Sequence, residues 1–313
     1  MQRIVVTGGT GFVGRAVCEQ LSRRWPGVAI VVPTRRLRFG CDLQTIPGVQ
    51  IVPADIHDGQ QLARVLAGAD AVVHLVAILH GSAAQFERAH VELPRQLAAA
   101  CLSAAVRRVV HVSALGVDAQ APSNYLRSKA AGEEALRSAG LDLSVLRPSV
   151  IFGARDRFLN VFAQLQVAAP VVPLAGADAR FQPVWVDDVA RAVVQCLDDP
   201  TTIGRTYECA GPDVVTLADL VRLAGRLSGH ERPIVPLPDW AGRLQARVME
   251  MLPGEPLMST DNVDSMRVPN IASGTLPGLR ELGIEPAALA AIAPGYLAPG
   301  QGVARLDRWR AQR

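Results

Sequence analysis

The chain has 313 residues, of which 49% are hydrophobic and 19% are charged, and its formal net charge at pH 7 is +3. This composition indicates a globular protein that can bury an extensive core, and it excludes a disordered chain. The small net charge and the lack of a long basic run argue against a nucleic-acid partner.

The cysteines, the histidines and the apolar stretches also indicate the cellular compartment and whether a metal is bound. The 5 cysteines are scattered without a CxxC pair, which indicates reduced thiols rather than disulfides or a zinc site. The histidines show no HExxH spacing, so we expect no metal site. Glycines interrupt the N-terminal apolar run too early for a signal peptide. Prolines and a glycine interrupt the most apolar later stretch, around 284–299. We therefore expect a cytoplasmic protein that does not cross a membrane.

In chain order, the first half alternates apolar runs with helix-period segments, which is typical of parallel strands joined by crossover helices. Strands are predicted at residues 3–7, 28–33, 49–55, 70–76, 107–113 and 143–148. Asp58 is a candidate N-cap of a helix that ends at Gly68, and Ser123 or Asn124 caps another that ends before Gly140. The predicted fold class is α/β, a doubly wound parallel sheet of the Rossmann type with a smaller C-terminal, substrate-side subdomain.

After Gly153 the alternation breaks, and residues 154–182 look irregular. A strand and a helix are then expected in PVWVDDVARAVVQCL, a strand in TYECAG, and a helix in TLADLVRLAGRL, where Thr216 and Asp219 resemble a capping box. A further helix is expected near 240–251. These features predict a main nucleotide-binding domain at 1–228, with 154–182 contributing to the substrate side, and a small subdomain at 229–313.

Three surface features have two interpretations each. Asp187 and Asp188 are adjacent at a helix start, where N-capping is the expected role. An apolar stripe is interpreted as core packing, with a lipid- or quinone-facing groove as the alternative. Its members are Trp240, Leu244, Val248 and Met251. The basic C-terminus, RLDRWRAQR, is interpreted as a solvated tail, with a contact to an acidic lipid surface or partner as the alternative.

A glycine-rich loop, TGGTGFVG, follows the first predicted strand and begins the first helix. Glycines at this spacing allow a tight turn, close approach to a pyrophosphate and close packing of helix on strand, and the helix N-terminus favours an anion. The strand before and the helix after the loop make dinucleotide binding the favoured interpretation over a turn without a ligand. The candidate cofactor contacts are Gly8, Thr10, Gly11, Phe12 and Gly14.

The second strand ends in VVPTRRLR, without the acidic residue that would accept bonds from a ribose 2′-hydroxyl. A guanidinium at this place pairs with a 2′-phosphate, so Arg35 and Arg36 favour NADP(H) over NAD(H). The alternative is that both arginines are surface charges. Asp55 and Ile56, at the end of the third strand, are placed to hold the adenine, although Asp55 could equally serve as a loop residue or cap. Ala77 follows the fourth strand, where the backbone must pass near the adenosine half.

Lys129 is the only lysine in the chain, and it lies four residues after Tyr125 in a predicted helix, on the same face. An ammonium lowers the pKa of a neighbouring phenol from its free value of about 10, which would make Tyr125 a proton donor and acceptor near neutrality. The same ammonium can hold ribose hydroxyls. A compact point charge suits this task better than a guanidinium does.

Several motifs together resemble the extended short-chain dehydrogenase/reductase family. The resemblance is carried, over roughly residues 1–153, by five segments in the family's order: TGGTGFVG, VVHLVA, VSALG, YLRSK and RPSVIFG. They include matches to the family's TGxxGxxG loop, YxxxK pair and RPxxxxG segment. The later FQPVWVDDVA resembles the family's segment that leads back to the main domain. More narrowly, PGEPLMSTDNVDSMRVPN together with SALG and YLRSKAAGE resembles a branch of the NAD-dependent epimerase/dehydratase family. That branch contains the NADPH-binding accessory subunit of respiratory complex I and its bacterial relatives.

The resemblance implies a role for each matched position. Tyr125 would be the general acid/base and Lys129 its partner and a ribose ligand. Pro148, Ser149 and Val150 would lie near the nicotinamide. Two departures stand against catalysis: after the fifth strand only Ser113 offers a hydroxyl, since Ala114 and Leu115 follow, and His90 stands where the family often has asparagine.

Two functions are compatible with these features. The first is an NADP(H)-dependent oxidoreductase or epimerase/dehydratase acting on a carbonyl or hydroxyl of a small molecule, with Tyr125, Lys129 and Ser113 as catalytic residues. The second is a non-catalytic nucleotide-binding structural or assembly protein linked to respiratory complex I or quinone metabolism, in which case the protein would lie peripherally at the inner membrane. Fold resemblance cannot choose between them.

Overall fold

The computed structural model describes residues 1–254 and 256–298. The chain forms two compact units, and each is built from separate stretches of sequence. The first unit contains Met1–Pro148, Val186–Cys209 and Ser273–Ile284, and the second contains Ser149–Trp185, Ala210–Ala272 and the rest of the described chain from Glu285. The boundary predicted at 228/229 falls inside the second unit, because α6 (Leu159–Ala168) and α8 (Leu217–Ser228), far apart in sequence, pack on each other there.

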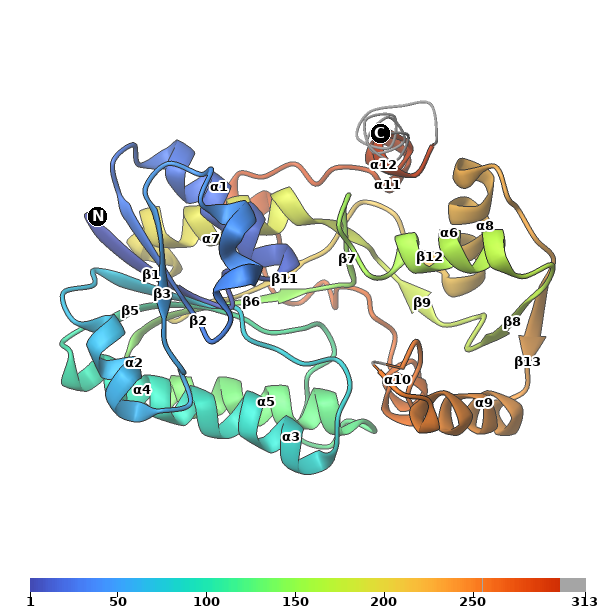
Figure 1. Ribbon diagram of the computed structural model, residues 1–313, viewed down its shortest axis with the longest axis horizontal. Helices are drawn as coiled ribbons and strands as arrows, with labels where there is room; N and C mark the ends of the chain where they lie inside the picture. Colours follow the sequence, from blue (N-terminus) through green and yellow to red (C-terminus); the bar gives the residue numbers. More distant parts are fainter. Residues whose placement is uncertain (255, 299–313) are drawn as a thin grey trace. The chain divides into compact units, whose positions relative to one another are not determined.

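The first unit is built on a parallel sheet, to which the described chain contributes seven strands (Figure 1). Their order across the sheet is β11-β6-β5-β4-β1-β2-β3, so the strand order switches direction between β1 and β4, as expected of a doubly wound fold. The strands are β1 (Arg3–Thr7), β2 (Ala29–Thr34), β3 (Val49–Pro53), β4 (Ala71–His74), β5 (Arg108–Val112), β6 (Asp142–Pro148) and β11 (Thr206–Cys209). The predicted α/β fold and all six predicted strands are confirmed, with ends moved by a few residues.

Helices cover both faces of this sheet. In Figure 1, α1 and α7 lie on one side and α2, α4 and α5 on the other. The helical segments are α1 (Phe12–Arg24), η1 (Leu37–Leu43), α2 (Gly59–Leu66), α3 (Ala83–Glu87), η2 (Arg88–Glu92), α4 (Leu93–Ser103), α5 (Asn124–Arg137), α7 (Val186–Asp198), η3 (Pro200–Thr202) and η4 (Arg280–Leu282). Asp58 and Ser123 are the N-caps predicted for α2 and α5, each accepting backbone N–H bonds. Asp187 and Asp188 instead lie inside the first turn of α7, where the helix dipole stabilises a negative charge.

The core beneath α2, α4 and α5 explains the apolar strands. Val72 and Val109 from neighbouring strands pack with Leu62, Leu97 and Leu136 from the three helices, and each of these side chains is completely or almost completely buried. Because side chains alternate across a strand, the residues between them serve the opposite face, which α1 and α7 cover. Burial on both faces is the reason that the strands are apolar throughout.

The second unit consists of short paired strands and helices. The strands are β7 (Ile151–Phe152), β8 (Val172–Ala175), β9 (Arg180–Phe181), β10 (Val184–Trp185), β12 (Val215–Thr216) and β13 (Ile234–Leu237), and the helices are α6 (Leu159–Ala168), α8 (Leu217–Ser228), α9 (Asp239–Met251), α10 (Thr260–Ser265), α11 (Leu289–Ile292) and α12 (Pro294–Leu297). The capping box of Thr216 and Asp219 at the start of α8 is confirmed. The prediction that 154–182 is irregular was wrong, because α6 forms there and buries Leu159 and Ala163 against α8.

The apolar stripe of α9 corrects a second prediction. Trp240 and Met251 expose 71% and 85% of their surface, and Leu244 and Val248 expose 56% and 53%. They therefore do not pack in the core, because the small residues Gly242 and Ala246 occupy the inward face of this helix. Within the described residues, no helix is both long enough and apolar enough to span a bilayer. The basic C-terminal sequence RLDRWRAQR lies outside the described residues.

Candidate functional site

The glycine loop lies at the carboxyl end of β1, as predicted. Gly8 has a φ of +78°, and a Cβ added at Gly14 would lie 2.4 Å from the carbonyl oxygen of Gly8. α1 begins after Gly11, which has no side chain to cap the first N–H groups. These N–H groups are therefore free to bind an anion. The turn in front of them stays accessible to a ligand because its glycines carry no side chains. Gly9, which the motif does not require, is needed because its Cβ would meet Val32 of β2 at 2.8 Å.

Basic residues follow β2 at the neighbouring edge. Arg35 and Arg36 are exposed, and no carboxylate among the described residues forms an ion pair with either of them. The guanidinium of Arg36 lies 5.7 Å from the centre of the Phe39 ring, which limits its freedom. Asp55 forms a local turn, because its carboxylate accepts the N–H of His57 at 3.0 Å, while Asp58 caps the helix. The loop-residue alternative for Asp55 thus holds in this structure, and it leaves the second carboxylate oxygen available to a ligand.

Lys129 lies on α5 and is almost completely buried, with its Nζ donating to the carbonyl oxygen of Val112 at 2.9 Å. Burial lowers the pKa of this ammonium to about 8, although the carboxylate of Glu133 opposes the shift. Tyr125 lies one turn earlier on the same face. Burial raises the pKa of the Tyr125 hydroxyl to about 12. The prediction that Lys129 lowers this pKa was therefore wrong, because the ammonium is directed at a backbone carbonyl and desolvation of the phenol dominates.

His90 ties the helix of Tyr125 to the segment after β4. Its Nε2 accepts the N–H of Ile78 at 3.0 Å, so its Nδ1 carries the proton and faces the hydroxyl of Ser128 at 2.9 Å. Ser128 in turn donates to the carbonyl oxygen of Tyr125. His90 belongs to the π-helical turn η2, and its carbonyl would lie 1.9 Å from a Cβ at Gly132 of α5. The residue that replaces the family's asparagine thus positions α5, a role that spacing alone did not reveal.

A pair of buried histidines lies on adjacent strands beside Lys129. His74 and His111 are register partners on β4 and β5, and their rings stack with centres 5.2 Å apart. Nδ1 of His74 lies 2.7 Å from the hydroxyl of Thr7 on β1. Burial and the nearby Lys129 lower the pKa of His74 to about 3 and hold that of His111 well below its usual value. Both imidazoles are therefore neutral at pH 7 and add no charge to the site.

Ser113 follows β5, as predicted, but its hydroxyl lies close to a buried carboxylate. Glu133 of α5 is completely buried and receives two hydrogen bonds from Arg147, at 2.9 and 2.7 Å, and one from Arg137 at 2.8 Å. Burial opposes ionisation of Glu133, yet Arg147, Ser113 and Arg137 together hold its pKa below the usual range. The Ser113 hydroxyl is buried near this carboxylate but makes no hydrogen bond of normal geometry among the described residues, so the ion pairs of Glu133 do not occupy it.

The segment after β6 is held by an asparagine from the C-terminal motif. Pro148 ends β6 and accepts the N–H of Leu115 at 2.9 Å. In the second unit, Oδ1 of Asn270 accepts the hydroxyl proton of Ser149 at 2.7 Å and the N–H of Val150 at 2.8 Å. Asn270 closes the VPN end of the stretch that carried the narrower resemblance, so that stretch fixes the conformation of Ser149 and Val150. Sequence reasoning missed this role because the two segments are 120 residues apart.

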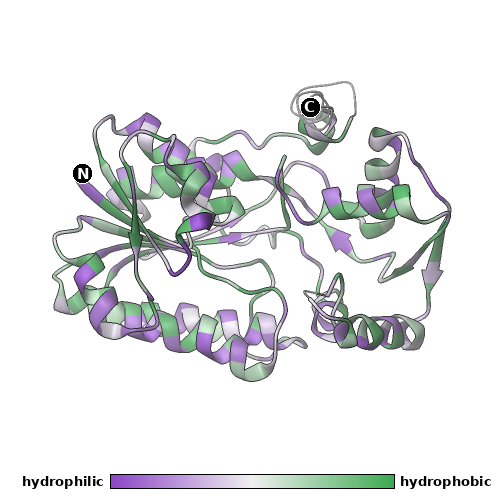
Figure 2. Ribbon diagram, viewed as in Figure 1, coloured by the Kyte–Doolittle hydropathy of each residue, from purple (hydrophilic) through white to green (hydrophobic). Residues whose placement is uncertain are grey.

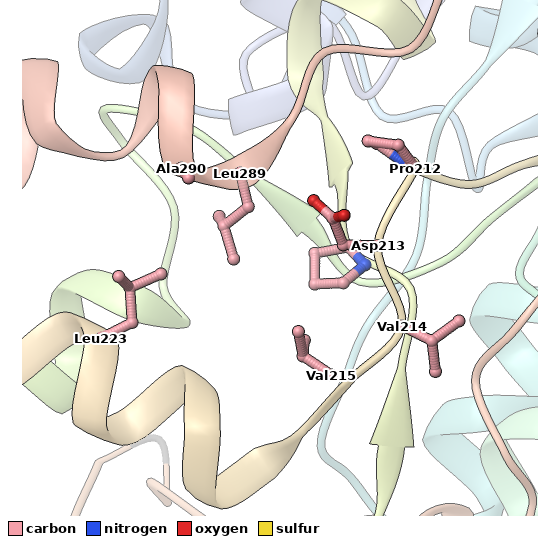
Figure 3. Close-up of a pocket in the computed structure, with 8 residues that line it drawn as sticks. Pro212, Asp213, Val214, Val215, Leu223, Leu289 and Ala290 are labelled. Carbon is pink, nitrogen blue, oxygen red and sulfur yellow. The ribbon is translucent and has the colours of Figure 1, made fainter.

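The second unit also contains a hollow of about 430 Å³ beside α8 and α11 (Figure 3). Its wall is mostly apolar, with Val215, Leu223 and Leu289 around it, and Asp213 supplies a carboxylate at its edge. No cluster of three or more potential metal ligands occurs among the residues that the structure describes. None of the predicted site residues lines this hollow.

Comparison with known proteins identifies the family. The model of the "NAD dependent epimerase/dehydratase family" matches residues 4–210, well over half of the chain. This protein belongs to that family. The matched residues include the glycine loop, Tyr125 and Lys129, and they end just after β11.

Relatives within the family include subunits of a respiratory complex as well as an enzyme. The mitochondrial NADH dehydrogenase [ubiquinone] 1 alpha subcomplex subunit 9 of Mus musculus is 32% identical over 300 residues, covering 91% of this chain and 76% of the mouse protein. The ceramide reductase of Caulobacter vibrioides is 28% identical over 238 residues, covering 75% and 74% of the two chains. The predicted resemblance to the complex I accessory subunit is thus confirmed.

A solved structure confirms the fold. The NADPH-dependent quinone oxidoreductase of Escherichia coli, solved in complex with NADPH, superposes with a TM-score of 0.75 at 21% identity and covers 94% of this chain and 99% of that one. Solved members of this fold bind NAD or NADPH, so a nicotinamide dinucleotide is the cofactor class of this family.

Proposed function

We propose that this protein is an NADP(H)-dependent oxidoreductase that reduces a carbonyl group to a hydroxyl group. One observation carries the proposal: the buried Lys129, one helical turn from Tyr125, holds an ammonium at the end of β5 despite the cost of desolvation. A buried ammonium with a lowered pKa is an expensive feature, and such groups concentrate at functional sites. A solvated helix position would need no such group.

The glycine loop and the basic residues after β2 suit NADP(H). A Cβ at Gly14 would clash with the backbone of the turn, so this position needs glycine. The uncapped N–H groups of α1 would donate hydrogen bonds to the pyrophosphate. Arg35 and Arg36 would bind the 2′-phosphate, because β2 is followed by no carboxylate that would accept a free 2′-hydroxyl. Asp55, Ile56 and Ala77 would then contact the adenosine half.

The chain's own groups would handle the proton. A reduced nicotinamide, when bound, supplies the hydride that adds to the carbonyl carbon. Tyr125 would donate its hydroxyl proton to the carbonyl oxygen as that bond is reduced, and Lys129 would hold the nicotinamide ribose. Pro148 and Val150 would border the nicotinamide. Ser113, whose buried hydroxyl has no hydrogen-bond partner among the described residues, would donate a hydrogen bond to the same carbonyl oxygen.

Reduction of a carbonyl is favoured over epimerisation by the two reductases among the proteins of similar sequence. A ceramide reductase is among the similar proteins and a quinone oxidoreductase among the similar structures. Both names describe redox chemistry on an oxygen-bearing carbon of an apolar molecule. We therefore propose a carbonyl compound with apolar substituents as the substrate class.

The second candidate is a nucleotide-binding subunit or assembly factor of a membrane-bound respiratory complex that performs no chemistry. It is favoured by the 32% identity to the mouse subunit over 91% of this chain. The high pKa of Tyr125 also suits it. In that case Lys129 would hold the ribose, and NADPH would stabilise the native fold by binding only to it.

Nucleotide titration and a single variant separate the candidates. We expect NADPH to bind the purified protein more tightly than NADH does, and replacing Arg35 and Arg36 together by Ser to remove most of that difference. With quinones and long-chain ketones as substrates, we expect Tyr125→Phe to lower kcat by about 100-fold or more while NADPH still binds.

Two results would contradict the proposal at different points. Tighter binding of NADH would overturn the assignment of Arg35 and Arg36. Absence of turnover in the wild type, together with tight NADPH binding and co-purification with respiratory subunits, would favour the non-catalytic candidate. Turnover that Tyr125→Phe leaves unchanged would remove Tyr125 from the mechanism.

A further inference from the structure

Side chains, more than a sheet, hold residues 149–153, the segment that contains Val150. Its strand β7 is 2 residues long and pairs with the equally short β10. β7 is hydrophobic along its length (Figure 2), so its own side chains offer no hydrogen-bonding groups. Two side-chain acceptors bind the backbone instead: Asn270 binds the N–H of Val150, and Asp156 binds the N–H of Gly153. The conformation of this segment therefore depends on where those two side chains lie.

The side-chain amide of Asn270 can bind this segment in one orientation only. A backbone N–H can donate but not accept, so the atom that lies 2.8 Å from the Val150 nitrogen must be the amide oxygen and not the amide nitrogen. The same oxygen accepts the hydroxyl proton of Ser149 at 2.7 Å, and Ser149 is only 4% exposed. The amide nitrogen of Asn270 forms no hydrogen bond with any residue that the structure describes. The side chain of Asn270 therefore holds the segment through its oxygen alone.

The backbone of Asn270 is itself fixed against β9. Its N–H donates to the carbonyl oxygen of Arg180 at 2.8 Å, and its carbonyl oxygen accepts the N–H of Gln182 at 3.0 Å. Together these bonds form a parallel bridge to Phe181. Because they use backbone groups only, a substitution at position 270 leaves them in place and changes only what the side chain holds.

Both backbone polar groups of Val150 are occupied. Its N–H donates to Asn270, and its carbonyl oxygen accepts the N–H of Val184 in β10 at 3.0 Å. Its half-buried side chain is therefore the part of Val150 that remains for a ligand to contact. A branched apolar side chain suits the face of a ring and not a hydrogen-bonding group.

We infer that Asn270 is a positioning residue for the nicotinamide: it fixes the backbone of Val150 so that the Val150 side chain packs on one face of the ring. The inference rests on the proposed function, in which Val150 borders the nicotinamide. Packing on one face leaves the other face for the substrate. A misplacement of reacting groups by about 1 Å can cost about 100-fold in rate, so a loosened Val150 should slow hydride transfer more than it weakens binding.

The binding of two nucleotides tests the inference with the full-length protein. Calorimetric titration compares NADPH with ADP-ribose 2′-phosphate, which is NADPH without its nicotinamide. We expect Asn270→Ala to weaken NADPH binding by about threefold or more and to leave the Kd of the analogue unchanged, because only the nicotinamide loses a contact. With quinones and long-chain ketones as substrates, the same change should lower kcat by about tenfold. Asn270→Asp keeps an oxygen at this place, so it should return NADPH affinity and kcat to near the wild-type values.

Tyr296→Phe is the matched control. The Tyr296 hydroxyl donates to Oδ2 of Asp156 at 3.0 Å, and the same oxygen accepts the N–H of Gly153 at the other end of the segment. The change removes one hydrogen bond near the segment but leaves those of Asn270 in place. It should therefore alter the affinity for neither nucleotide, and thermal unfolding checks that each variant is folded.

Three results would overturn the inference. The first is an equal loss of affinity for both nucleotides in Asn270→Ala, which would mean a general structural role. The second is no change in NADPH affinity or kcat, and the third is a failure of Asn270→Asp to restore what Asn270→Ala loses. If Asn270→Ala separates the two nucleotides as expected but no substrate is turned over by the wild type, only the proposed reaction is wrong. A wild type that does not bind NADPH would overturn both.

Discussion

Lys129 carries a positive charge at a buried position, and we expect the cost of desolvating that charge to lower the stability of the nucleotide-free protein. Its pKa falls from the ordinary 10.5 to about 8. The ammonium is therefore penalised in the folded state, and the full penalty applies below pH 8. As pH rises from about 8 to 10.5, the folded protein loses this proton before the unfolded chain does, so this residue's contribution to stability rises with pH.

Replacing this lysine tests the cost directly. A shift from 10.5 to about 8 corresponds to about 3 kcal/mol, of which the hydrogen bond to Val112 offsets about 1 kcal/mol. Lys129→Met should therefore stabilise the nucleotide-free protein by about 2 kcal/mol at pH 7 in urea unfolding, and should weaken NADPH binding. The gain should shrink near pH 10, where wild-type Lys129 is largely neutral when folded. If the Lys129→Met variant is less stable than the wild type at pH 7, the ammonium does not carry this penalty.

At the level of elements, the junction of β1 and α1 depends on the absence of side chains. A Cβ at Gly14 would lie 2.4 Å from the carbonyl oxygen of Gly8 and 2.5 Å from the Cα of Gly9, and backbone atoms cannot move aside as a flexible side chain would. The helix would have to move away from the strand, and the turn that offers N–H groups to a pyrophosphate would move with it.

Gly14→Ala should therefore cost about 1–3 kcal/mol of stability and weaken NADPH binding by about tenfold or more. Thermal unfolding and nucleotide titration measure the two effects. Gly59→Ala is the matched control, because Gly59 begins α2 and a Cβ there would meet no atom within 4 Å. It should be neutral or slightly stabilising. Equal behaviour of the two variants would mean that the loop tolerates a side chain and is not closed around a ligand.

At the level of the whole molecule, the residues assigned to the nucleotide lie mainly in the first unit, whereas α9 lies in the second. A ligand present at 100 times its Kd stabilises the state that binds it by about 2.7 kcal/mol. NADPH should therefore slow hydrogen exchange in residues 7–14 and 124–129 and leave residues 239–251 unchanged. Mass-spectrometric exchange with and without NADPH checks this. Protection confined to α9, or absent from the glycine loop, would contradict the placement of the cofactor.

The sequence predicted the parallel sheet well because each strand carries its own signal. A run of β-branched residues between turn signals indicates a buried strand wherever it occurs, and the glycine loop and the Tyr125–Lys129 spacing are local for the same reason. The helix of 159–168 was missed because Phe158 stands at its N-cap position, its periodicity is weak, and its burial depends on α8. The prediction that Trp240 packs in the core was wrong for a similar reason, because periodicity shows that an apolar stripe exists and not which way it faces.

By itself, the sequence determined the fold class, the glycine loop after the first strand and the placement of Tyr125 and Lys129 one helical turn apart, because these depend on residues close together in the chain. The tertiary structure alone decided where the ammonium points, that Glu133 pairs with Arg147, and that Asn270 holds Ser149 and Val150. It also decided that α9 turns its apolar side outward. Hydrogen-bond partners, burial and pKa values depend on groups brought together from distant parts of the chain. The spacing of residues along the sequence does not show which of these groups will be in contact.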